Sequence, residues 1–251
     1  MSNQVSLITG ASSGIGRALA LELGKDGARL AIAARRRDLL DELATETGKP
    51  AQDILVSTCD VASQKNVKET VAAAVERFGR IDLAILAAGV GGKTNPLKFH
   101  AGAIENLISI NLLGVAYCLE ELIPLMLRQG GGTIAVISSI AADRGIPDSA
   151  AYCASKAAVS TLCEGLRGTL RKHNVRLVTI EPGYVRTAMT EGFKRMPFVM
   201  EADEAARLIL RRIKRGDRVI RFPLLPSLFM KLVRLVPNVL FDAATGGKTI
   251  S

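Results

Sequence analysis

The stretch that decides the fold stands near the beginning of the chain: Val5-Ser6-Leu7-Ile8-Thr9-Gly10-Ala11-Ser12-Ser13-Gly14-Ile15-Gly16. Its first four residues form an apolar run typical of a buried strand, and residues 17–23 after it have the pattern of a helix. Glycines at a strand-to-helix turn let the backbone approach a diphosphate, and the helix N-terminus offers unpaired N–H groups there. The spacing G-x-x-x-G-x-G therefore predicts a dinucleotide-binding turn, although such turns also occur as plain connections.

The rest of the chain continues the alternation of strands and helices. Apolar runs predict strands at 30–34, 54–59, 83–86, 133–137, 176–180 and 218–221, and helical patterns fall near 38–47, 64–78, 101–128, 151–172 and 202–215. Continuous apolar strands separated by helices are typical of a parallel sheet covered on both faces. With 251 residues, 48% of them apolar, residues 1–251 are expected to form one Rossmann-type α/β domain, a doubly wound parallel sheet of about seven strands.

Composition narrows the function classes. The net charge is +9, and residues 201–251 supply +5 of it, with ten Lys or Arg against five Asp or Glu. No aromatic side chains alternate with these basic residues, so we expect a basic solvated surface and no nucleic-acid partner. No stretch reaches the roughly 18 uncharged apolar residues that a membrane span needs, and the first residues lack the pattern of a secretory signal.

The cysteines and histidines show no pattern typical of a metal site. The four cysteines are Cys59, Cys118, Cys153 and Cys163. They lack C-x-x-C pairing and are predicted to be small buried hydrophobes in a reducing compartment. His100 and His173 stand far apart in the sequence. We therefore expect a cytoplasmic protein without a bound metal.

The end of the second predicted strand bears on the choice of cofactor. An acidic residue about 20 positions after the glycines would bind a ribose 2′-hydroxyl and select NAD, but Ala34 stands there. Three arginines follow, and guanidinium groups bind phosphate in a bidentate manner. We predict NADP(H), with Arg35 as the first choice for the 2′-phosphate contact and Arg36 as the second, while at least one of the three arginines is simply solvated. Asp60 is predicted either to accept a hydrogen bond from the adenine amine or to serve as a turn residue.

A second constellation, Tyr152-Cys153-Ala154-Ser155-Lys156, points to acid–base chemistry. Tyr and Lys four residues apart share one face of a helix, and a neighbouring ammonium favours the phenolate form of a tyrosine. Ser139 ends the fifth predicted strand, at the carboxyl edge where ligands of open α/β sheets bind. Together these three side chains can orient a carbonyl, protonate its oxygen and hold a ribose. Tyr-x-x-x-Lys alone occurs in many amphipathic helices, so its weight comes from its combination with the N-terminal turn.

In these motifs and in their order, the chain resembles the classical short-chain dehydrogenase/reductase family. The resemblance covers most of the chain and further includes Asp60-Val61, Ala88-Gly89, Asn111, Ser138-Ser139 and Pro182-Gly183-Tyr184-Val185-Arg186-Thr187. It implies a catalytic tetrad of Asn111, Ser139, Tyr152 and Lys156. In that tetrad Tyr152 would be the acid/base, Ser139 would orient the carbonyl, and Lys156 would anchor the ribose. Asn111 would interrupt its helix and hold a water of a proton relay.

The resemblance also implies how the cofactor is held and how the chain assembles. The implied cofactor-binding residues are Gly10, Ser12, Ser13, Gly14, Ile15, Gly16, Arg35, Arg36, Asp60, Val61, Ala88, Gly89, Tyr152, Lys156, Pro182, Gly183, Val185 and Thr187. Members of the family usually dimerise through the helices that correspond to 101–128 and 151–172, and they often form tetramers. A homodimer or homotetramer is therefore expected here.

The chain departs from the family pattern at two places, of which the first concerns a side chain that normally ties neighbouring strands together and the second concerns the substrate. The usual Asn-Ala-Gly after the fourth strand is Ala87-Ala88-Gly89 here, and the chain lacks the Asp-Gly-Gly ending common in ketoacyl reductases. Its apolar tail looks more like the branch that acts on sterol, sphingoid or other lipophilic carbonyls. The predicted lid at 189–200 also favours an apolar substrate, unless its hydrophobic residues only pack the loop; they are Phe193, Met196, Phe198, Val199 and Met200.

The C-terminal extension, residues 222–251, contains an amphipathic helix predicted at 225–236. Prolines stand at both of its ends, and Ser227, Lys231 and Arg234 fall opposite its apolar residues. We expect this helix to lie beside the cleft near the lid, or against another subunit. The alternative is a peripheral membrane contact in which its basic face meets anionic lipid headgroups. Residues 242–251, small and polar, are predicted to be a loose end.

These observations predict an NADP(H)-dependent oxidoreductase that interconverts a ketone and a secondary alcohol by hydride transfer on an apolar or lipid-like substrate. Two alternatives stay open, a non-catalytic NADP-binding regulatory or scaffold protein and a reductase of small polar carbonyls. The intact tetrad favours an enzyme over a binding protein, whereas the fold alone would not, since this architecture hosts many functions.

Overall fold

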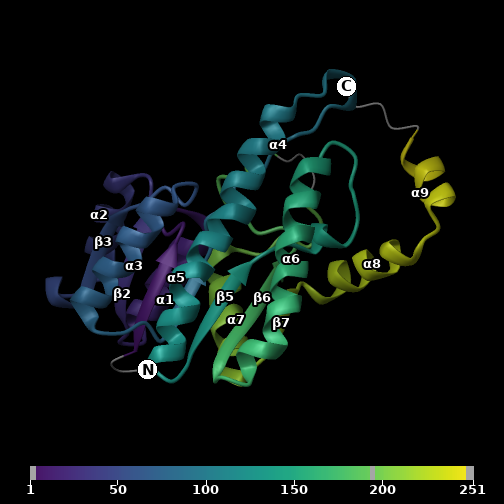
Figure 1. Cartoon of the computed structure of the whole chain (residues 1–251). Helices are drawn as coiled ribbons and strands as arrows, with labels where there is room; N and C mark the ends of the chain where they lie inside the picture. The colour runs from purple at the N-terminus through teal and green to yellow at the C-terminus, as the bar shows by residue number, and fades with distance from the viewer. Residues whose placement is uncertain (1–3, 193–195, 247–251) are drawn as a thin grey trace.

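The computed structural model describes residues 4–192 and 196–246, in which helices flank a central sheet (Figure 1). Seven parallel strands form one sheet in the order β3-β2-β1-β4-β5-β6-β7. Their bounds are β1 Val5–Thr9, β2 Arg29–Ala34, β3 Ile54–Thr58, β4 Leu83–Leu86, β5 Gly132–Ile137, β6 Val175–Pro182 and β7 Val219–Phe222. The predicted doubly wound sheet is confirmed, and the seventh strand pairs in parallel with β6.

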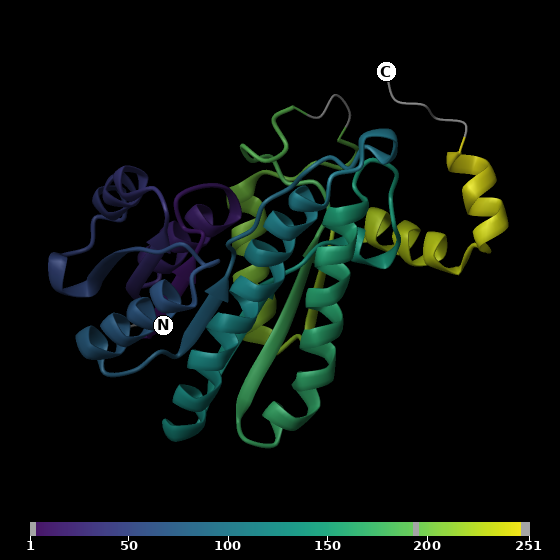
Figure 2. The same cartoon turned by 45° about the horizontal axis from the view of Figure 1, so that its top comes forward.

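Two hydrophobic cores explain why the strands are apolar throughout. On one face the sheet packs against α1 Gly14–Lys25, α2 Arg37–Glu46 and α7 Ala202–Arg215. On the other face it packs against α3 Gln64–Phe78, α5 Gly114–Arg128 and α6 Ala150–Arg171 (Figure 2). Side chains alternate between the two faces of a strand, so each strand contributes to both cores. Leu7 of β1, for example, belongs to one core and Ile8 to the other.

The helix predicted at 101–128 is one continuous helical stretch with an irregular middle. It consists of α4 Ala101–Ile108, the π-helical turn η3 Ser109–Leu113, and α5. The stretch is long and apolar enough to cross a membrane by composition, but half of its most apolar window is buried inside the protein, as expected for a core helix. Short 3₁₀ segments occupy η1 Ala51–Asp53, η2 Pro96–Lys98 and η4 Ile140–Asp143.

The chain order of the strands fixes where a ligand can enter. From β1 the chain moves outward through β2 and β3, and it then returns to place β4 on the other side of β1. Helices on the two sides therefore diverge beyond the carboxyl ends of β1 and β4, and they leave a crevice there. This switch point carries the glycine turn of residues 9–16.

The C-terminal extension leaves the body of the domain. After β7 the chain forms α8 Leu224–Leu235 and α9 Asn238–Thr245, and we call Leu224–Thr245 the C-terminal arm. Figures 1 and 2 show this arm, in yellow, projecting from the sheet beyond β7. The predicted helix at 225–236 is present and begins two residues earlier than Pro226. The loose end predicted from Asp242 is wrong for its first residues, since 242–245 belong to α9; residues 247–251 lie outside the described part.

Candidate active site

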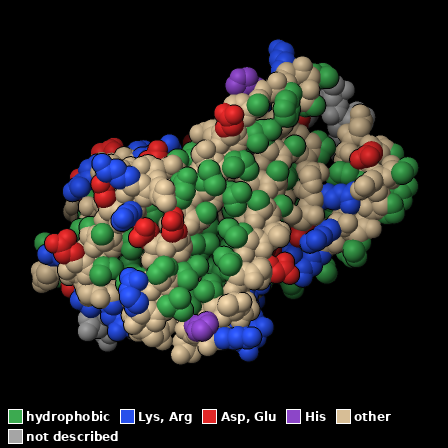
Figure 3. Space-filling view, viewed as in Figure 1, with side chains coloured by type: hydrophobic (Ala, Val, Ile, Leu, Met, Phe, Trp, Pro, Cys, Tyr) green, Lys and Arg blue, Asp and Glu red, His purple; other side chains and the backbone are tan. Residues whose placement is uncertain are grey.

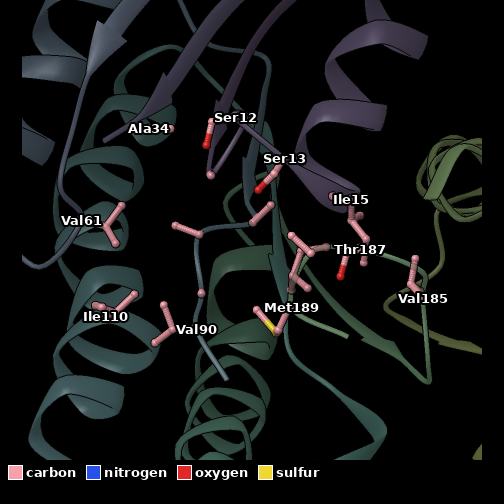
Figure 4. Close-up of a pocket in the computed structure, with 18 of the residues that line it drawn as sticks. Ser12, Ser13, Ile15, Ala34, Val61, Val90, Ile110, Val185, Thr187 and Met189 are labelled. Carbon is pink, nitrogen blue, oxygen red and sulfur yellow. The ribbon is translucent and has the colours of Figure 1, made fainter. Parts of the chain in front are cut away.

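The sequence-predicted residues line one pocket at the carboxyl edge of the sheet (Figure 4). All the cofactor-binding candidates border it, as do Ser139, Tyr152 and Lys156. Only Asn111 of the predicted set is absent from the lining, because its side chain is fully buried behind it. Residues that sequence reasoning missed complete the wall. They include Val90 and Ile110, and Met189 and Thr190 of the predicted lid border the pocket as well.

The missed residues had weak signals in the sequence. Val90 directly follows Gly89, and Ile110 precedes Asn111, so adjacency to a motif is the only sequence feature that indicates these two residues.

In Figure 4 Val61, Val90 and Ile110 point toward the pocket from one side, and Thr187 and Met189 from another. The pocket thus has a polar end at Ser12 and Ser13 and an apolar end toward the lid.

Steric crowding explains the glycines of the turn. Gly10 has a φ of +69°, and a Cβ built on it would lie 2.6 Å from the backbone Cα of Ala88. Gly14 has a φ of +57°, and its Cβ would meet Thr187 Cγ2 at 3.0 Å. A Cβ on Gly16 would collide with the backbone carbonyl of Gly10. Side chains are therefore excluded at the places where the backbone borders the pocket, as a cradle for a diphosphate requires.

The three arginines after β2 take different positions. Arg36 donates hydrogen bonds from Nη2 to Ser12 Oγ at 3.0 Å and to Ser13 Oγ at 2.9 Å, so its guanidinium lies over the glycine turn. Arg37 points away and pairs with Asp41 on α2, as expected for a solvated member of the cluster. Arg35 is exposed and borders the pocket. No carboxylate stands at Ala34, and Arg35 and Arg36 outnumber Asp60, the acidic residue that borders the pocket after the neighbouring strand β3.

Asp60 has the turn role that was one of its two predicted functions. Its Oδ1 accepts a hydrogen bond from the backbone N–H of Ala62 at 3.0 Å. The side chain still borders the pocket beside Val61. The second role, as acceptor for an adenine amine, stays a prediction.

Tyr152, Lys156 and Ser139 form the polar centre of the pocket. Lys156 Nζ lies 5.9 Å from the centroid of the Tyr152 ring and donates a hydrogen bond to the carbonyl of Ile137 at 2.9 Å. Ser139 follows β5 by two residues and caps η4, where its Oγ accepts a hydrogen bond from the backbone N–H of Ala141 at 3.1 Å. These contacts hold the serine and lysine in place from the end of the strand, so both face the same space as the tyrosine.

Burial controls the protonation of this centre. Burial raises the pKa of Tyr152 above its ordinary value, and the hydrogen bond with Ser139 opposes that shift. Burial also lowers the pKa of Lys156 to about 8. From the sequence we expect the ammonium of Lys156 to favour the phenolate form of Tyr152. In the described structure desolvation is the larger effect, because the tyrosine is enclosed and the lysine is directed toward Ile137.

Asn111 stands in the π-helical turn η3 and supports the site from behind. Its side-chain amide donates to the carbonyl of Val90 at 3.0 Å and to Ser155 Oγ at 3.0 Å, and its Oδ1 accepts from the N–H of Val90 at 2.8 Å. The expected interruption of the helix is present at this residue. Because both ends of the amide are used, Asn111 ties the segment after β4 to helix α6.

A chain of buried polar groups continues behind the pocket toward the C-terminal arm. Ser138 Oγ donates to the carbonyl of Lys156 at 2.9 Å and lies 2.8 Å from Ser160 Oγ, which donates in turn to Glu181 at 3.1 Å. Glu181 pairs with Arg221 at 3.0 Å, and Arg221 also pairs with Asp143 of η4. Burial raises the pKa of Glu181, and Arg221 opposes this shift.

The lid predicted at 189–200 is described except for residues 193–195, so Phe193 lies outside the described residues. A short bridge between Val185 and Met200 closes the base of the loop. Met189 borders the pocket, while Phe198 is 60% exposed. None of the described residues of the C-terminal arm lines this pocket, in contrast to the expected position of its helix beside the cleft.

All four cysteines are buried and free, as the sequence predicts. Burial is the largest cause of a raised pKa at each thiol, including Cys153, which directly follows Tyr152. For Cys163 the pKa rises to about 11. Thiolate forms of these residues are therefore scarce at neutral pH.

Comparison with known proteins identifies the relatives of this chain. Residues 4–197 match the family described as short chain dehydrogenase. An uncharacterized oxidoreductase of Myxococcus xanthus (strain DK1622) is 37% identical over 246 residues, which cover 97% of each chain. Among solved structures, levodione reductase superposes with a TM-score of 0.83 at 29% identity, covering 91% of this chain and 99% of that one. An actinorhodin polyketide ketoreductase with NADPH gives a TM-score of 0.80 at 26% identity, covering 88% and 97%.

Proposed function

Because the chain belongs to the short-chain dehydrogenase/reductase family and is therefore an oxidoreductase of that family, we propose that it interconverts a ketone and a secondary alcohol with NADP(H). The observation that carries this proposal is the convergence of Ser139, Tyr152 and Lys156 on the pocket that the glycine turn opens. A protein that only bound a nucleotide would need the turn but not this triad.

The residues of the pocket suit a dinucleotide cofactor. The crowded glycines would let the backbone and the N-terminus of α1 approach its diphosphate. Val185 and Thr187 would contact the nicotinamide end, and Asp60 with Val61 the adenine end. When bound, the cofactor supplies or accepts the hydride.

The preference for the phosphorylated cofactor follows from the charge of the rim. Arg36 is already held beside Ser12 and Ser13, so a 2′-phosphate at this place would find guanidinium and hydroxyl donors together. We therefore rank Arg36 above Arg35 as the main phosphate contact, the reverse of the order expected from sequence. The solved actinorhodin polyketide ketoreductase with NADPH supports the phosphorylated cofactor by analogy.

In the reductive direction, Tyr152 would donate its phenolic proton to the carbonyl oxygen while the carbonyl carbon receives the hydride. Burial favours the protonated phenol, which is the form that this direction requires. Ser139 Oγ would donate a hydrogen bond to the same oxygen and fix its position. Lys156 would bind the ribose hydroxyls and exchange the proton that Tyr152 loses, and Asn111 would hold the backbone around the relay.

An apolar or lipid-like substrate is the class that the pocket favours. Met189 of the lid borders the pocket beside Thr187, and Val90 and Ile110 add further apolar wall. A small polar carbonyl would leave these apolar groups uncovered. It remains the alternative substrate class that a substrate panel should include.

Assembly and location belong to the same proposal. Figure 3 shows hydrophobic side chains gathered over the helical layer that contains α4, α5 and α6. Leu113 and Leu127 in this layer are 40% and 43% exposed. We propose that this layer is the interface of a homodimer or homotetramer, and that the protein works in the cytoplasm.

The decisive experiment measures NADPH oxidation by purified protein across a panel of ketones that ranges from small and polar to long-chain and polycyclic. Oxidation with apolar ketones that disappears in Tyr152→Phe, while NADPH still binds, would support the proposal. Undiminished NADPH binding without turnover on any carbonyl would favour the binding-protein alternative.

A further inference from the structure

The C-terminal arm presents its apolar side chains to solvent. Six of them in α8 are more than half exposed, and two more in α9 are exposed to a similar degree. They are Leu224, Leu225, Leu228, Phe229, Leu232, Leu235, Val239 and Leu240. Exposed apolar side chains gathered in this number on one segment mark a contact with another molecule, because soluble proteins usually expose large apolar residues singly.

The helix α8 has three distinct sides. Ser227, Met230 and Val233 face the body and are buried or half-buried. Leu225, Leu228, Phe229 and Leu232 form the outward apolar stripe, because an α-helix advances about 100° per residue. Lys231 lies between the outward stripe and Ser227, whereas the exposed Arg234, in the last turn, lies on the side of Ser227 and Met230, away from the stripe. This pattern places one basic group at the margin of an apolar face that the protein itself leaves uncovered, and a second one farther from it.

The arm is held in this position by Arg144, which follows η4. Its guanidinium donates to the carbonyl groups of Arg234 and Val236 at 3.1 and 2.8 Å, and to Asn238 Oδ1 at 2.9 Å. It also lies 4.3 Å above the centroid of the Phe241 ring. A cation at the C-terminus of α8 neutralises its unpaired carbonyls and fixes the junction with α9. The contacts of Arg144 thus hold α8 in the orientation that exposes the stripe to solvent.

We propose that the C-terminal arm docks on the surface of a lipid bilayer that contains anionic headgroups. The charge of the arm favours such a surface, because residues 224–245 contain two basic residues, Lys231 and Arg234, against one acidic residue, Asp242, which lies in α9 and not in the stripe of α8. Amphipathic helices of this kind bury the apolar stripe at the boundary of the acyl chains and leave flanking lysine and arginine near the phosphates.

The geometry of the arm favours lying on a membrane over crossing it. The axes of α8 and α9 are bent by 117°. At a rise of about 1.5 Å per residue, neither helix approaches the roughly 30 Å thickness of a hydrocarbon core. A second copy of the chain is the less suitable occupant, since the layer of α4, α5 and α6 already offers a separate apolar face for it.

A second exposed segment lies at the same end of the molecule. Leu97 and Phe99 are 85% and 64% exposed, and Lys98 stands between them. In Figures 1 and 2 this segment around η2 and helix α9 both lie at the end toward which the carboxyl ends of the strands point. Docking through both segments would turn the mouth of the pocket toward the bilayer, from which an apolar substrate could enter.

The test is sedimentation of the full chain with vesicles of phosphatidylcholine, alone or with about one third phosphatidylglycerol. The protein should pellet with the anionic vesicles, and high salt should release part of it. Leu228→Asp/Leu232→Asp should lower the partition coefficient at least tenfold, whereas the matched Leu228→Met/Leu232→Met should retain it. Lys231→Gln/Arg234→Gln should weaken binding about tenfold.

Controls separate docking from damage to the fold. Arg171→Gln/Lys172→Gln makes the same charge change at the far end of α6 and should bind like the natural chain. Far-UV circular dichroism and NADPH binding identify any variant that is misfolded. Protein that stays in the supernatant with every vesicle, or aspartate variants that bind undiminished, would overturn the proposal. Loss of self-association in the aspartate variants without vesicle binding by the natural chain would overturn it in favour of a second copy.

Discussion

The glycine turn and the C-terminal arm lie at two extremes of packing in one molecule. In the turn a single added methyl group would lie 2.6 Å from neighbouring backbone, whereas Leu235 and Val239 in the arm are 78% and 80% exposed. The conformation of the turn is fixed by the backbone packed around it, whereas the apolar side chains of the arm are proposed to be covered only when a membrane surface is bound. Substitutions in the turn and its pocket should therefore act on chemistry in solution, and those in the arm only where a surface is present.

The largest effect is expected for Tyr152→Phe. Loss of the phenolic hydroxyl removes the proton donor without changing the shape of the pocket, so turnover should fall by about 10²–10⁴-fold. NADPH affinity, measured by fluorescence titration, should change little, because the aromatic ring that borders the pocket is kept. Turnover close to that of the natural chain would remove Tyr152 from the proposed mechanism.

The second largest effect, on NADPH binding, is expected for Gly10→Ala in the crowded turn. The residue has a positive φ, and its Cβ would meet the backbone of Ala88, which cannot move aside as a side chain can. We expect loss of NADPH binding by about 100-fold, or unfolding. The matched control is Gly165→Ala in α6, where nothing lies within 4 Å. Thermal melting of this control should show stabilisation of about 0.5–1 kcal/mol, because alanine favours a helix.

A smaller effect is expected at the arginines. Arg36→Ala should weaken NADPH binding by about 10–100-fold, since a charged hydrogen bond contributes roughly 1.5–3 kcal/mol, and it should leave NADH almost unchanged. Arg37→Ala, whose guanidinium pairs with Asp41, is the control and should alter neither constant. Equal affinity of the natural chain for NADPH and NADH would contradict the proposed 2′-phosphate site.

Lys156 allows a test of stability rather than of binding. Its pKa is about 8 in the folded chain against 10.5 when unperturbed, so the unfolded state holds more protons between these values. The free energy of unfolding should therefore gain a positive contribution as the pH rises from about 8 to 10.5. Lys156→Met should remove this contribution and add on the order of 2 kcal/mol of stability at pH 7, while abolishing turnover. Chemical denaturation at several pH values measures it.

The smallest effect in solution should follow Arg144→Ala. The substitution removes the hydrogen bonds that hold α8 against α9, yet the arm contributes none of the described residues of the pocket. NADPH oxidation with a soluble ketone should stay within about twofold, while amide hydrogen exchange in the arm should accelerate. A large loss of activity would show that the arm and the pocket are coupled through η4.

The same contrast explains what the sequence could predict. The turn, the strands and the triad depend on local patterns, so their positions agree with the structure. The periodicity of the sequence predicts helix α8. It does not predict which surface packs against α8, because no pattern within a helix specifies what covers its apolar face. The rank of Arg36 over Arg35 depends on hydroxyl groups 23 and 24 residues away. The link from Ser138 to Arg221 joins four segments of the chain, and only the packed sheet brings them together.

The buried thiols have a practical consequence for following the arm. Since all four natural cysteines are enclosed and mostly protonated, maleimide reagents should leave the folded chain unlabelled. A cysteine introduced by Leu232→Cys on the exposed stripe would then be the single reactive thiol, with no need to delete the others. An environment-sensitive fluorophore attached there would change its emission as the stripe leaves water. The natural sequence therefore permits site-specific fluorescent labelling of the arm without removal of its own cysteines.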